Sequence, residues 1–454
     1  MRLRITRRRL DPRLVLGVVV GCASLAAATV ACSSDDSPRG FEEASASDSG
    51  ASLPSTDAGT TDATTTPATD ASTADAAKFD ASALPISCEN GASCATAITT
   101  TLAEGFCVIL QDATVACWGE NMHYELGRGA DAGISDSANP ARVEGLANIV
   151  TLEHSCAVDK DGGAWCWGLG PWLRSTTAFV TAESAPVKLD IPPAKKVSAA
   201  LFSETKGAAC ALFDTGVSCW GSNDNAQVAP SDTLTTPNAT QAVTPVALGS
   251  SSPVRDLTVG YASFAIHEDG TVSSWGNNPT IGRVSSLFPD AYPRTIPLSD
   301  VTMVSAPYGD ICALSNGVPY CWGDPRGSLG DILERALPSP VVFPSGVTQI
   351  ASTSRSAGNF SYPVRVCAID EKGDLLCWGN NSKGQVGDGT TTYALEPVKV
   401  SLPAPAARVS TTSTATCAIL TNGKVYCWGD NAQGQLGNGQ LRVPSRVPQE
   451  VVLP

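Results

Sequence analysis

The cysteines are the residues of this chain whose spacing most directly predicts chemistry. Six pairs have partners nine or ten residues apart, and Cys88 and Cys94 form a seventh pair just ahead of them. Structural zinc needs ligand pairs with two to four residues between partners, and the three histidines of the chain do not join the cysteines. We therefore predict disulfides and no metal site. The predicted bonds are Cys88–Cys94, Cys107–Cys117, Cys156–Cys166, Cys210–Cys219, Cys312–Cys321, Cys367–Cys377 and Cys417–Cys427.

Other reactive side chains do not combine into a catalytic set. His154 and Ser155 lie in a predicted strand beside Cys156, which is a poor place for a nucleophile and its base. The sequence GDNAQGQLGNG (429–439) has the polar residues of a calcium loop, yet it lacks the terminal glutamate and the alternating ligand spacing. We expect the polar residues of this segment to form a turn. We also expect no cofactor and no enzymatic activity, although a propeller, the fold predicted below, can house catalysis at its axis.

Each cysteine pair brackets a hairpin. In CALSNGVPYC the Asn316-Gly317 loop pairs Ser315 with Val318 and brings Cys312 opposite Cys321. Facing residues of an antiparallel pair have Cα atoms roughly 4.5–5.5 Å apart, which is within reach of a disulfide. The hairpin around Asp214-Thr215 has the same length, but its turn type stays open. The register therefore predicts the bonds.

Three longer hairpins have Gly162, Gly373 or Gly423 as the third residue of a three-residue loop, where a left-handed conformation is needed. The first hairpin has Ala113 at this position, so either a strained turn or a different loop is expected. The fourth hairpin keeps Gly270 but has Phe264 and Ser274 where the cysteines would be. Both partners are missing together, as expected for a bonded pair.

These hairpins belong to a repeat whose units end in Trp-Gly. Successive Trp-Gly pairs are 47–56 residues apart, and each unit contains strand-like segments and glycine turns. This period predicts an all-β chain folded as a seven-bladed β-propeller. Each tryptophan is expected to fill the wedge between blades and to reach a neighbouring carbonyl, while the glycine allows the backbone of the adjacent blade to approach. The tryptophans are Trp118, Trp167, Trp220, Trp275, Trp322, Trp378 and Trp428.

The two ends of the repeat region are predicted to close the ring. Residues 95–119 contain only the last part of a repeat, and the tail after Trp428 contains only the opening part. Their lengths add up to about one period. We therefore expect the C-terminal strand around Val451 to Leu453 to join the sheet begun by residues 97–118, so that N- and C-terminal strands close the ring and remove two open edges.

The last repeats resemble a known family. WGDNAQGQLGNG (428–439) and WGNNSKGQVGDGTTT (378–392) are similar to repeats of the regulator-of-chromosome-condensation type, and the copies from Trp118 and Trp322 are weaker. The resemblance covers roughly 95–454 and implies a seven-bladed propeller. The founder of the family exchanges nucleotide on a small GTPase and binds chromatin, which does not suit an acidic, disulfide-bonded chain. A secreted bacterial inhibitor of β-lactamase, similar in fold, implies protein binding by one propeller face.

The N-terminus predicts export. Six arginines precede an apolar stretch, so residues 1–31 are interpreted as a lipoprotein signal peptide and Cys32 as the lipidated residue, with Cys22 as the alternative. Ordinary cleavage near Ala31 would instead release a soluble protein. Residues 32–87 are predicted to form a disordered tether rich in Ser, Thr, Ala and Asp, and residues 88–454 the propeller. The protein would sit on the bacterial outer membrane or cell surface, anchored by lipid alone.

Charge narrows the choice of partner. The formal net charge is −14, and removal of residues 1–31, which contain six arginines and one aspartate, would leave −19. Such a surface has no electrostatic footprint for nucleic acid. We expect a monomeric scaffold that binds an extracytoplasmic protein or polysaccharide; a carbohydrate-binding or carbohydrate-active propeller is the alternative, which acidic residues clustered with Trp172 in an axial pocket would favour. The candidate binding elements are the inserts 226–252 and 352–362 and the exposed aromatic anchor Trp172, with Trp165 as a second candidate.

Overall fold

The computed structural model describes residues 79, 82–88, 93–175, 177–228, 240–307, 309–323, 336–353 and 365–454. The chain divides into two units, Met1–Ser72 and Thr73–Pro454, and all described residues belong to the second. The predicted signal peptide, Cys22, Cys32 and most of the predicted tether therefore lie outside the described residues.

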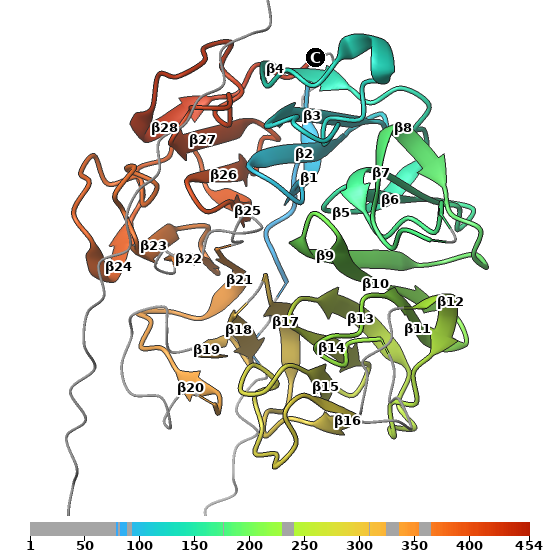
Figure 1. Ribbon diagram of the computed structural model, residues 1–454. Coiled ribbons are helices and arrows are strands. Elements are labelled where there is room, and N and C mark those ends of the chain that lie inside the picture. The colour runs from blue at the N-terminus through green and yellow to red at the C-terminus, as the bar shows by residue number, and fades with distance from the viewer. Residues whose placement is uncertain are drawn as a thin grey trace, which may run out of the picture. The chain divides into compact units, whose positions relative to one another are not determined.

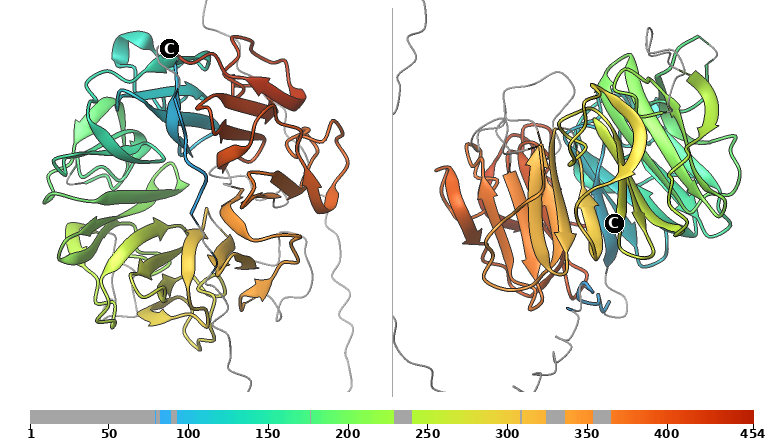
Figure 2. Two further views of the ribbon diagram at one scale, coloured as in Figure 1. Left: turned by 180° about the vertical axis from the view of Figure 1, so that it is seen from behind. Right: turned by 90° about the horizontal axis from the view of Figure 1, so that it is seen from below.

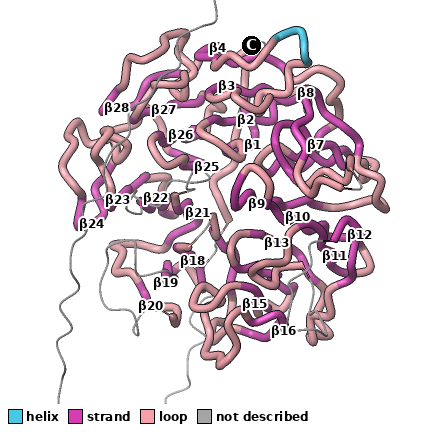
Figure 3. Tube along the Cα trace, in the orientation of Figure 1, coloured by secondary structure: helices cyan, strands magenta, loops and turns pink. Residues whose placement is uncertain are grey.

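The described residues form seven four-stranded antiparallel sheets, which surround a common axis as the blades of a propeller (Figure 1). Each sheet consists of four strands that are consecutive in the sequence, and strands make up almost all of its regular structure (Figure 3). Blades are numbered 1 to 7 from the N-terminus. The predicted all-β, seven-bladed propeller is confirmed.

The strand bounds follow the same order in every blade, from the axis outward. Blades 1 and 2 contain β1 (Ala95–Thr100), β2 (Gly105–Leu110), β3 (Val115–Gly119), the 3-10 helix η1 (Ala130–Ala132), β4 (Ser137–Arg142), β5 (Ile149–Glu153), β6 (Cys156–Asp159), β7 (Ala164–Gly170) and β8 (Thr181–Lys188). Blades 3 and 4 contain β9 (Lys196–Ser203), β10 (Lys206–Phe213), β11 (Gly216–Gly221), β12 (Thr240–Pro245), β13 (Val254–Val259), β14 (Ala262–His267), β15 (Val272–Gly276) and β16 (Asp290–Thr295).

The remaining three blades repeat this arrangement. Blades 5 and 6 contain β17 (Val301–Ser305), β18 (Asp310–Ser315), β19 (Val318–Gly323), β20 (Ser339–Pro340), β21 (Val347–Ser352), β22 (Arg365–Asp370), β23 (Leu375–Gly379) and β24 (Ala394–Lys399). Blade 7 contains β25 (Ala406–Thr411), β26 (Ala415–Leu420), β27 (Val425–Gly429) and β28 (Ser445–Glu450).

The hairpin between the second and third strand of each blade has the predicted register. The two cysteines face each other in all six hairpins that carry them, with Cα atoms 4.0–4.2 Å apart and sulfur atoms at bonding distance. In blade 4, Phe264 faces Ser274 at the same place. Cys88 and Cys94 also lie at bonding distance. The geometry therefore matches every predicted pair.

The turns explain this register. Asn316 and Gly317 have φ values of 47° and 75°, as a two-residue loop of this type requires. The three-residue loops place their glycine in the left-handed region, and Ala113 takes the same conformation with φ of 59°. The expectation of a strained turn at Ala113 is confirmed, because a side chain in this region costs roughly 1–2 kcal/mol.

In six of the seven blades, the described residues show a tryptophan that joins the blade to the one before it. The indole of Trp167 in blade 2 donates a hydrogen bond of 2.9 Å to the carbonyl of Glu125 in blade 1, and Trp118 in blade 1 donates one of 2.9 Å to Gln435 in blade 7. The structure describes the same bond for four further repeat tryptophans. The predicted packing role between blades is confirmed.

The Asn and Gln side chains of the repeat serve the loop itself. Asn431 accepts a hydrogen bond from the N–H of Leu436, and Gln435 accepts one from the N–H of Gln433. Leu436 is fully buried, and a Cβ built on Gly437 would lie 2.9 Å from the indole nitrogen of Trp118. The polar residues of this loop are thus used in turn formation, as predicted.

The Trp-Gly glycine permits close backbone approach both within its blade and between blades. A Cβ built on Gly119 would lie 2.5 Å from the Cα of Gly105, its partner on β2 of the same blade, and Gly119 has a φ of 109°. Gly119 therefore permits close approach within its own blade. A Cβ built on Gly168 in blade 2 would instead lie 3.1 Å from the Cα of Glu125 in blade 1, so the predicted approach of the adjacent blade's backbone is confirmed there.

The predicted shared blade is also wrong. The C-terminal strand β28 pairs with β27 inside blade 7, and β1 pairs with β2 inside blade 1. The lengths of the two end segments sum to one period simply because the chain begins with an inner strand and ends with an outer one. The terminal blades close the ring by packing: Val451 and Leu453 contact the hydrophobic core that contains Ala95 and Trp118.

The ends of the blades define two faces of the propeller (Figure 2). The loops that join the first to the second strand and the third to the fourth strand lie at one end, which we call the loop face. The hairpin turns and the links between blades lie at the other end, which we call the hairpin-turn face. On this face the N–H of Ala95 donates to the carbonyl of Gly423, and five other blade junctions have the same bond.

The ordered chain begins before the predicted boundary at residue 88. Leu84 lies against Gly373, and the N–H of Ser87 donates a hydrogen bond of 2.8 Å to the carbonyl of Thr421. The last residues of the predicted tether therefore pack on the hairpin-turn face.

Candidate functional site

Trp172 is buried, which contradicts its predicted role as a surface anchor. Its side chain is 1% exposed, and its indole donates a hydrogen bond of 2.8 Å to the carbonyl of Gly168. The neighbouring carbonyl of Pro171 accepts a hydrogen bond from the indole N–H of Trp220 in blade 3. In blade 1 the corresponding pair is Glu125 and the buried Leu126. Trp172 thus fills the place of this leucine in a shortened loop. Trp165, the second candidate, donates to the carboxylate of Asp159 and is half-buried.

The two predicted binding inserts are only partly described. Residues 229–239 and 354–362 lie outside the described residues. In the first insert, Ala226 to Val228 are buried and form the repeat loop of blade 3, and Thr240–Pro245 form β12. The described parts therefore belong to the blade framework.

The axis holds a cavity of about 230 Å³, lined by all seven first strands. The ammonium of Lys196 lies 2.5 Å from the carboxylate of Glu153 and 2.8 Å from that of Asp256. Although burial alone would lower the pKa of Lys196, the carboxylates of Asp256 and Glu153 outweigh it and raise this pKa. The three side chains come from blades 2, 3 and 4, so they tie adjacent blades together.

Hydroxyl groups at the axis also tie adjacent blades together. The backbone N–H of His154 donates to the hydroxyl of Thr99, and that of Val259 donates to the hydroxyl of Ser198. Burial lowers the pKa of His154, and its imidazole contacts the hydroxyl of Thr100 at 3.2 Å. These bonds join the inner strands of neighbouring blades, so the polar groups at the axis hold the blades together.

The axial cavity does not fit the carbohydrate alternative. Its acidic groups Glu153 and Asp256 are paired with Lys196, and the described lining contains no Trp, Tyr or Phe. Trp172 lies in the hydrophobic core between blades 2 and 3. The predicted combination of acidic residues with this tryptophan is therefore not assembled.

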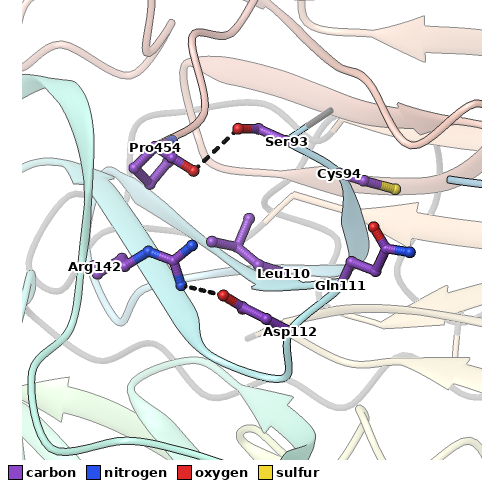
Figure 4. A pocket seen from close by; sticks show the side chains of 7 residues that line it. All are labelled: Ser93, Cys94, Leu110, Gln111, Asp112, Arg142 and Pro454. Atoms are coloured by element: carbon purple, nitrogen blue, oxygen red, sulfur yellow. Dashed lines mark hydrogen bonds and ion pairs between the residues drawn. The ribbon is translucent and has the colours of Figure 1, made fainter. Parts of the chain in front are cut away.

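A second pocket of about 340 Å³ lies at the junction of blades 1 and 7 on the hairpin-turn face (Figure 4). Arg142 is 2.6 Å from the carboxylate of Asp112, and the hydroxyl of Ser93 donates to the carbonyl of Pro454. Its charges neutralise each other and its walls are mostly polar.

The loop face of blade 4 presents apolar side chains to solvent. The loop from β15 to β16 exposes Val284 by 84% and Phe288 by 76%, and Leu287 on this loop and Tyr292 on β16 are also exposed. Scattered exposed apolar residues are normal on proteins, whereas four within nine residues are typical of an interaction site. Sequence reasoning missed this loop. The available signal was the pair Leu287-Phe288 in a turn-rich segment between two strands.

An ion pair holds this loop in place. The guanidinium of Arg283 lies 2.7 Å from the carboxylate of Asp290, and both side chains are buried. Burial alone would raise the pKa of Asp290, but hydrogen bonds from Arg283 and Ser285 lower it below its usual range. Asn278 donates to the carbonyls of Ser285 and Leu287. The loop is therefore fixed with its apolar side chains turned outward.

The same arginine contacts the position where blade 4 lacks a cysteine. Arg283 donates to the hydroxyl and to the carbonyl of Ser274, and this hydroxyl donates to the carbonyl of Ile281. Phe264, which faces Ser274, packs edge-on against Trp322 of blade 5. In blade 4 a buried polar network thus links the hairpin to the exposed loop.

The described residues were also considered as metal ligands and as membrane spans. Within them, no three His, Cys, Asp or Glu side chains are placed to hold a metal ion. Within the same residues, no helix has the length and apolarity needed to cross a bilayer.

Comparison with known proteins gives a family model for the last repeats. Residues 372–419 and 422–454 match a model described as regulator of chromosome condensation (RCC1) repeat, and a second model of the same description matches residues 356–385 and 407–435.

Curated relatives match parts of the chain. The RCC1-like G exchanging factor-like protein of Mus musculus is 30% identical over 162 residues, which cover 33% of this chain and 34% of that protein. The ultraviolet-B receptor UVR8 of Arabidopsis thaliana is 25% identical over 313 residues, covering 65% of this chain and 67% of the receptor. The chain thus spans about a third of the mouse relative.

A solved structure shows the same fold. The structure of Kap60 bound to yeast RCC1 (Prp20) contains a chain with a TM-score of 0.60 and 21% identity, covering 74% of this chain and 83% of that one. This likeness concerns the fold alone.

Proposed function

We propose that the chain, which is a seven-bladed β-propeller of the regulator-of-chromosome-condensation repeat type, is a non-catalytic scaffold that binds a protein through its loop face. The observation that carries this proposal is the rigid apolar loop of blade 4, with Val284 and Phe288 turned into solvent. A loop held in its binding conformation loses little conformational entropy on association, and a central aromatic residue is a frequent hot spot.

The form of the site favours a protein over a small molecule. Pockets for small ligands are concave and cover most of the ligand. The two described pockets have their charged groups paired internally, whereas Val284, Leu287 and Phe288 stand on an exposed loop and Tyr292 is exposed on the strand that follows it. One relative supports the same class, since it is named as a G exchanging factor-like protein.

A polysaccharide is the second candidate for this loop. Phe288 and Tyr292 offer rings on which a sugar could stack. A sugar also needs hydrogen-bonding partners, and the side chains of Ser285, Asp290 and Asn278 are engaged within the loop. Because these side chains already make hydrogen bonds, a protein partner is better supported than a polysaccharide.

Replacing Phe288 should weaken binding without unfolding the protein. In a pull-down from the native cell envelope with immobilised propeller, Phe288→Ser is expected to reduce capture of the partner at least about tenfold, because a buried aromatic anchor contributes 2 kcal/mol or more. The melting temperature should stay close to that of the wild type, since this side chain is 76% exposed.

Leu395→Ser is the matched control, because Leu395 is 82% exposed on the outer strand of blade 6. It removes a comparable apolar side chain from a surface away from the loop. Full capture by Phe288→Ser, or an equal loss in both variants, would contradict the assignment. Competition by soluble envelope oligosaccharides would identify the polysaccharide instead.

The chain is further proposed to work outside the cytoplasm as a lipid-anchored, monomeric envelope protein. Fourteen cysteines in pairs at bonding distance fit an oxidising compartment. The arginine-rich apolar lead and Cys32 support export and lipidation. The acidic charge supports a partner other than nucleic acid.

Cys32→Ser is expected to release the protein from the membrane fraction, because the proposed anchor is the lipid on this residue. Fractionation of cells expressing each variant, followed by immunoblotting, measures the release. Cys22→Ser is the control and should stay with the membrane. If Cys22→Ser is released and Cys32→Ser is retained, the alternative lipidation site is the right one.

A further inference from the structure

The residues ahead of β1 run across the hairpin-turn face before the chain enters blade 1. Figure 1 shows this segment in blue as it leads into β1, and in the edge-on view of Figure 2 blue chain lies beside the ends of the orange strands. We call the described residues 79, 82–88 and 93–94 the strap. The strap meets the hairpin turns of three consecutive blades, each time at the turn glycine: Gly317 in blade 5, Gly373 in blade 6 and Gly423 in blade 7.

The first contact is a socket for an aromatic ring. A Cβ built on Gly317 would lie 2.5 Å from Cδ1 of Phe79, and one built on Gly346 would lie 2.0 Å from Cε2 of the same ring. The ring is therefore held between two glycine backbones at the junction of blades 5 and 6. Neither glycine can carry a side chain while Phe79 stays in place.

The next contacts carry the strap to the ring closure. A Cβ on Gly373 would lie 2.8 Å from Cδ1 of Leu84, and Arg408 donates to the carbonyl of Leu84. Ile86 packs on the core shared by blades 1 and 7. A Cβ on Gly423 would lie 2.0 Å from the sulfur of Cys94. The strap thus contacts blades 5, 6 and 7 in turn.

We propose that the strap sets the place at which the N-terminal lead leaves the propeller: it moves this exit across the hairpin-turn face, from the junction of blades 1 and 7 to the junction of blades 5 and 6. This goes beyond the proposed function and does not rest on it.

The geometry gives the reason. A chain that entered β1 directly would leave the propeller at the junction of blades 1 and 7. The strap instead moves the exit to Phe79, at the junction of blades 5 and 6. It also covers the hairpin-turn face of three blades, while the loop of blade 4 with Val284 and Phe288 stays open at the other end.

Gly346→Ala tests the strap in the mature full-length chain. The φ of Gly346 lies outside the left-handed region, so an alanine adds only the clash with Phe79. Hydrogen exchange of the N–H of Ser87 should accelerate at least about tenfold in Gly346→Ala and in Phe79→Ala, because this N–H loses its bond to Thr421. The double variant should match Phe79→Ala, since the clash needs both partners. Fast exchange in the wild type, or no change in Gly346→Ala, would overturn the proposal.

Energy transfer then measures the exit itself. A donor dye at residue 76 is paired with an acceptor either at Lys372, exposed on the hairpin turn of blade 6, or at Lys160, exposed on the hairpin turn of blade 2. Transfer should be higher to Lys372, and Gly346→Ala should remove the difference. Equal transfer in the wild type would overturn the proposed exit at blades 5 and 6. Neither readout depends on lipidation or on a partner, so failure here is distinct from failure of the proposed function.

Discussion

Reduction of the purified protein should unfold the propeller at temperatures at which the oxidised protein stays folded. Each hairpin bond closes a loop with a separation of 9 or 10 residues, and such a bond contributes roughly 2–3 kcal/mol through the entropy of the unfolded chain. A folded domain is stable by about 5–15 kcal/mol in total. Six such contributions, even if they are not additive, are comparable with the whole of that stability.

Circular dichroism melting with and without a phosphine reductant measures the effect, and non-reducing peptide mapping checks the seven pairs. Removing one pair, as in Cys312→Ala with Cys321→Ala, should cost about as much as a single bond. A protein that melts at the same temperature after all thiols are shown to be free would contradict the stabilising role. Cysteines linked between blades would contradict the pairing.

Trp172→Ala should destabilise the propeller by roughly 3–5 kcal/mol, the usual cost of removing a large buried aromatic side chain. Trp172 is 1% exposed and fills the core between blades 2 and 3. Its backbone neighbour Pro171 also holds the indole of Trp220, so collapse of this loop loosens the junction of two blades. Urea unfolding followed by tryptophan fluorescence measures the change.

Trp172→Leu is the control, because leucine occupies the corresponding position in blades 1 and 7 as Leu126 and Leu436. It should retain part of the lost stability. If Trp172→Ala unfolds at the same urea concentration as the wild type but loses its partner, then this tryptophan is a binding residue after all and its burial is not what matters.

The fold could be predicted well wherever the sequence acts locally. The Asn316-Gly317 turn sets its own register because both residues must adopt positive φ, and this register alone brings Cys312 opposite Cys321. The Trp-Gly period predicted the blade number for a similar reason, since six of the seven units repeat the same contact with the unit before them among the described residues.

The wrong predictions concern the segment with which another segment pairs or packs. The end segments have the same combined length whether or not they share a blade, so length could not decide between two arrangements. Trp172 was misplaced because its loop is shorter than the others, which hid its equivalence to Leu126. The burial of Trp172 follows only from its contacts with residues of blade 3, and these residues lie far away in the sequence.

The binding loop and the strap were missed because their composition resembles that of ordinary linkers. Phe288 is one aromatic residue in a turn-rich segment, and its exposure depends on the distant pairing of Arg283 with Asp290. Phe79 ends a stretch of Ser, Thr, Ala and Asp, and its socket is made of two glycines more than 200 residues away. Neither set of contacts has a local signature.

The strap also determines how the protein answers a mechanical load. A pull on the N-terminal lead reaches Phe79 first, then Leu84 and the bond from Ser87 to Thr421, and only afterwards the Cys88–Cys94 loop and β1. Peeling residues 79–88 releases roughly 30 Å of chain at about 3.3–3.6 Å per residue. A pulling force therefore first detaches side chains of the strap from blades 5 and 6. It reaches the junction of blades 1 and 7 only after the strap has detached.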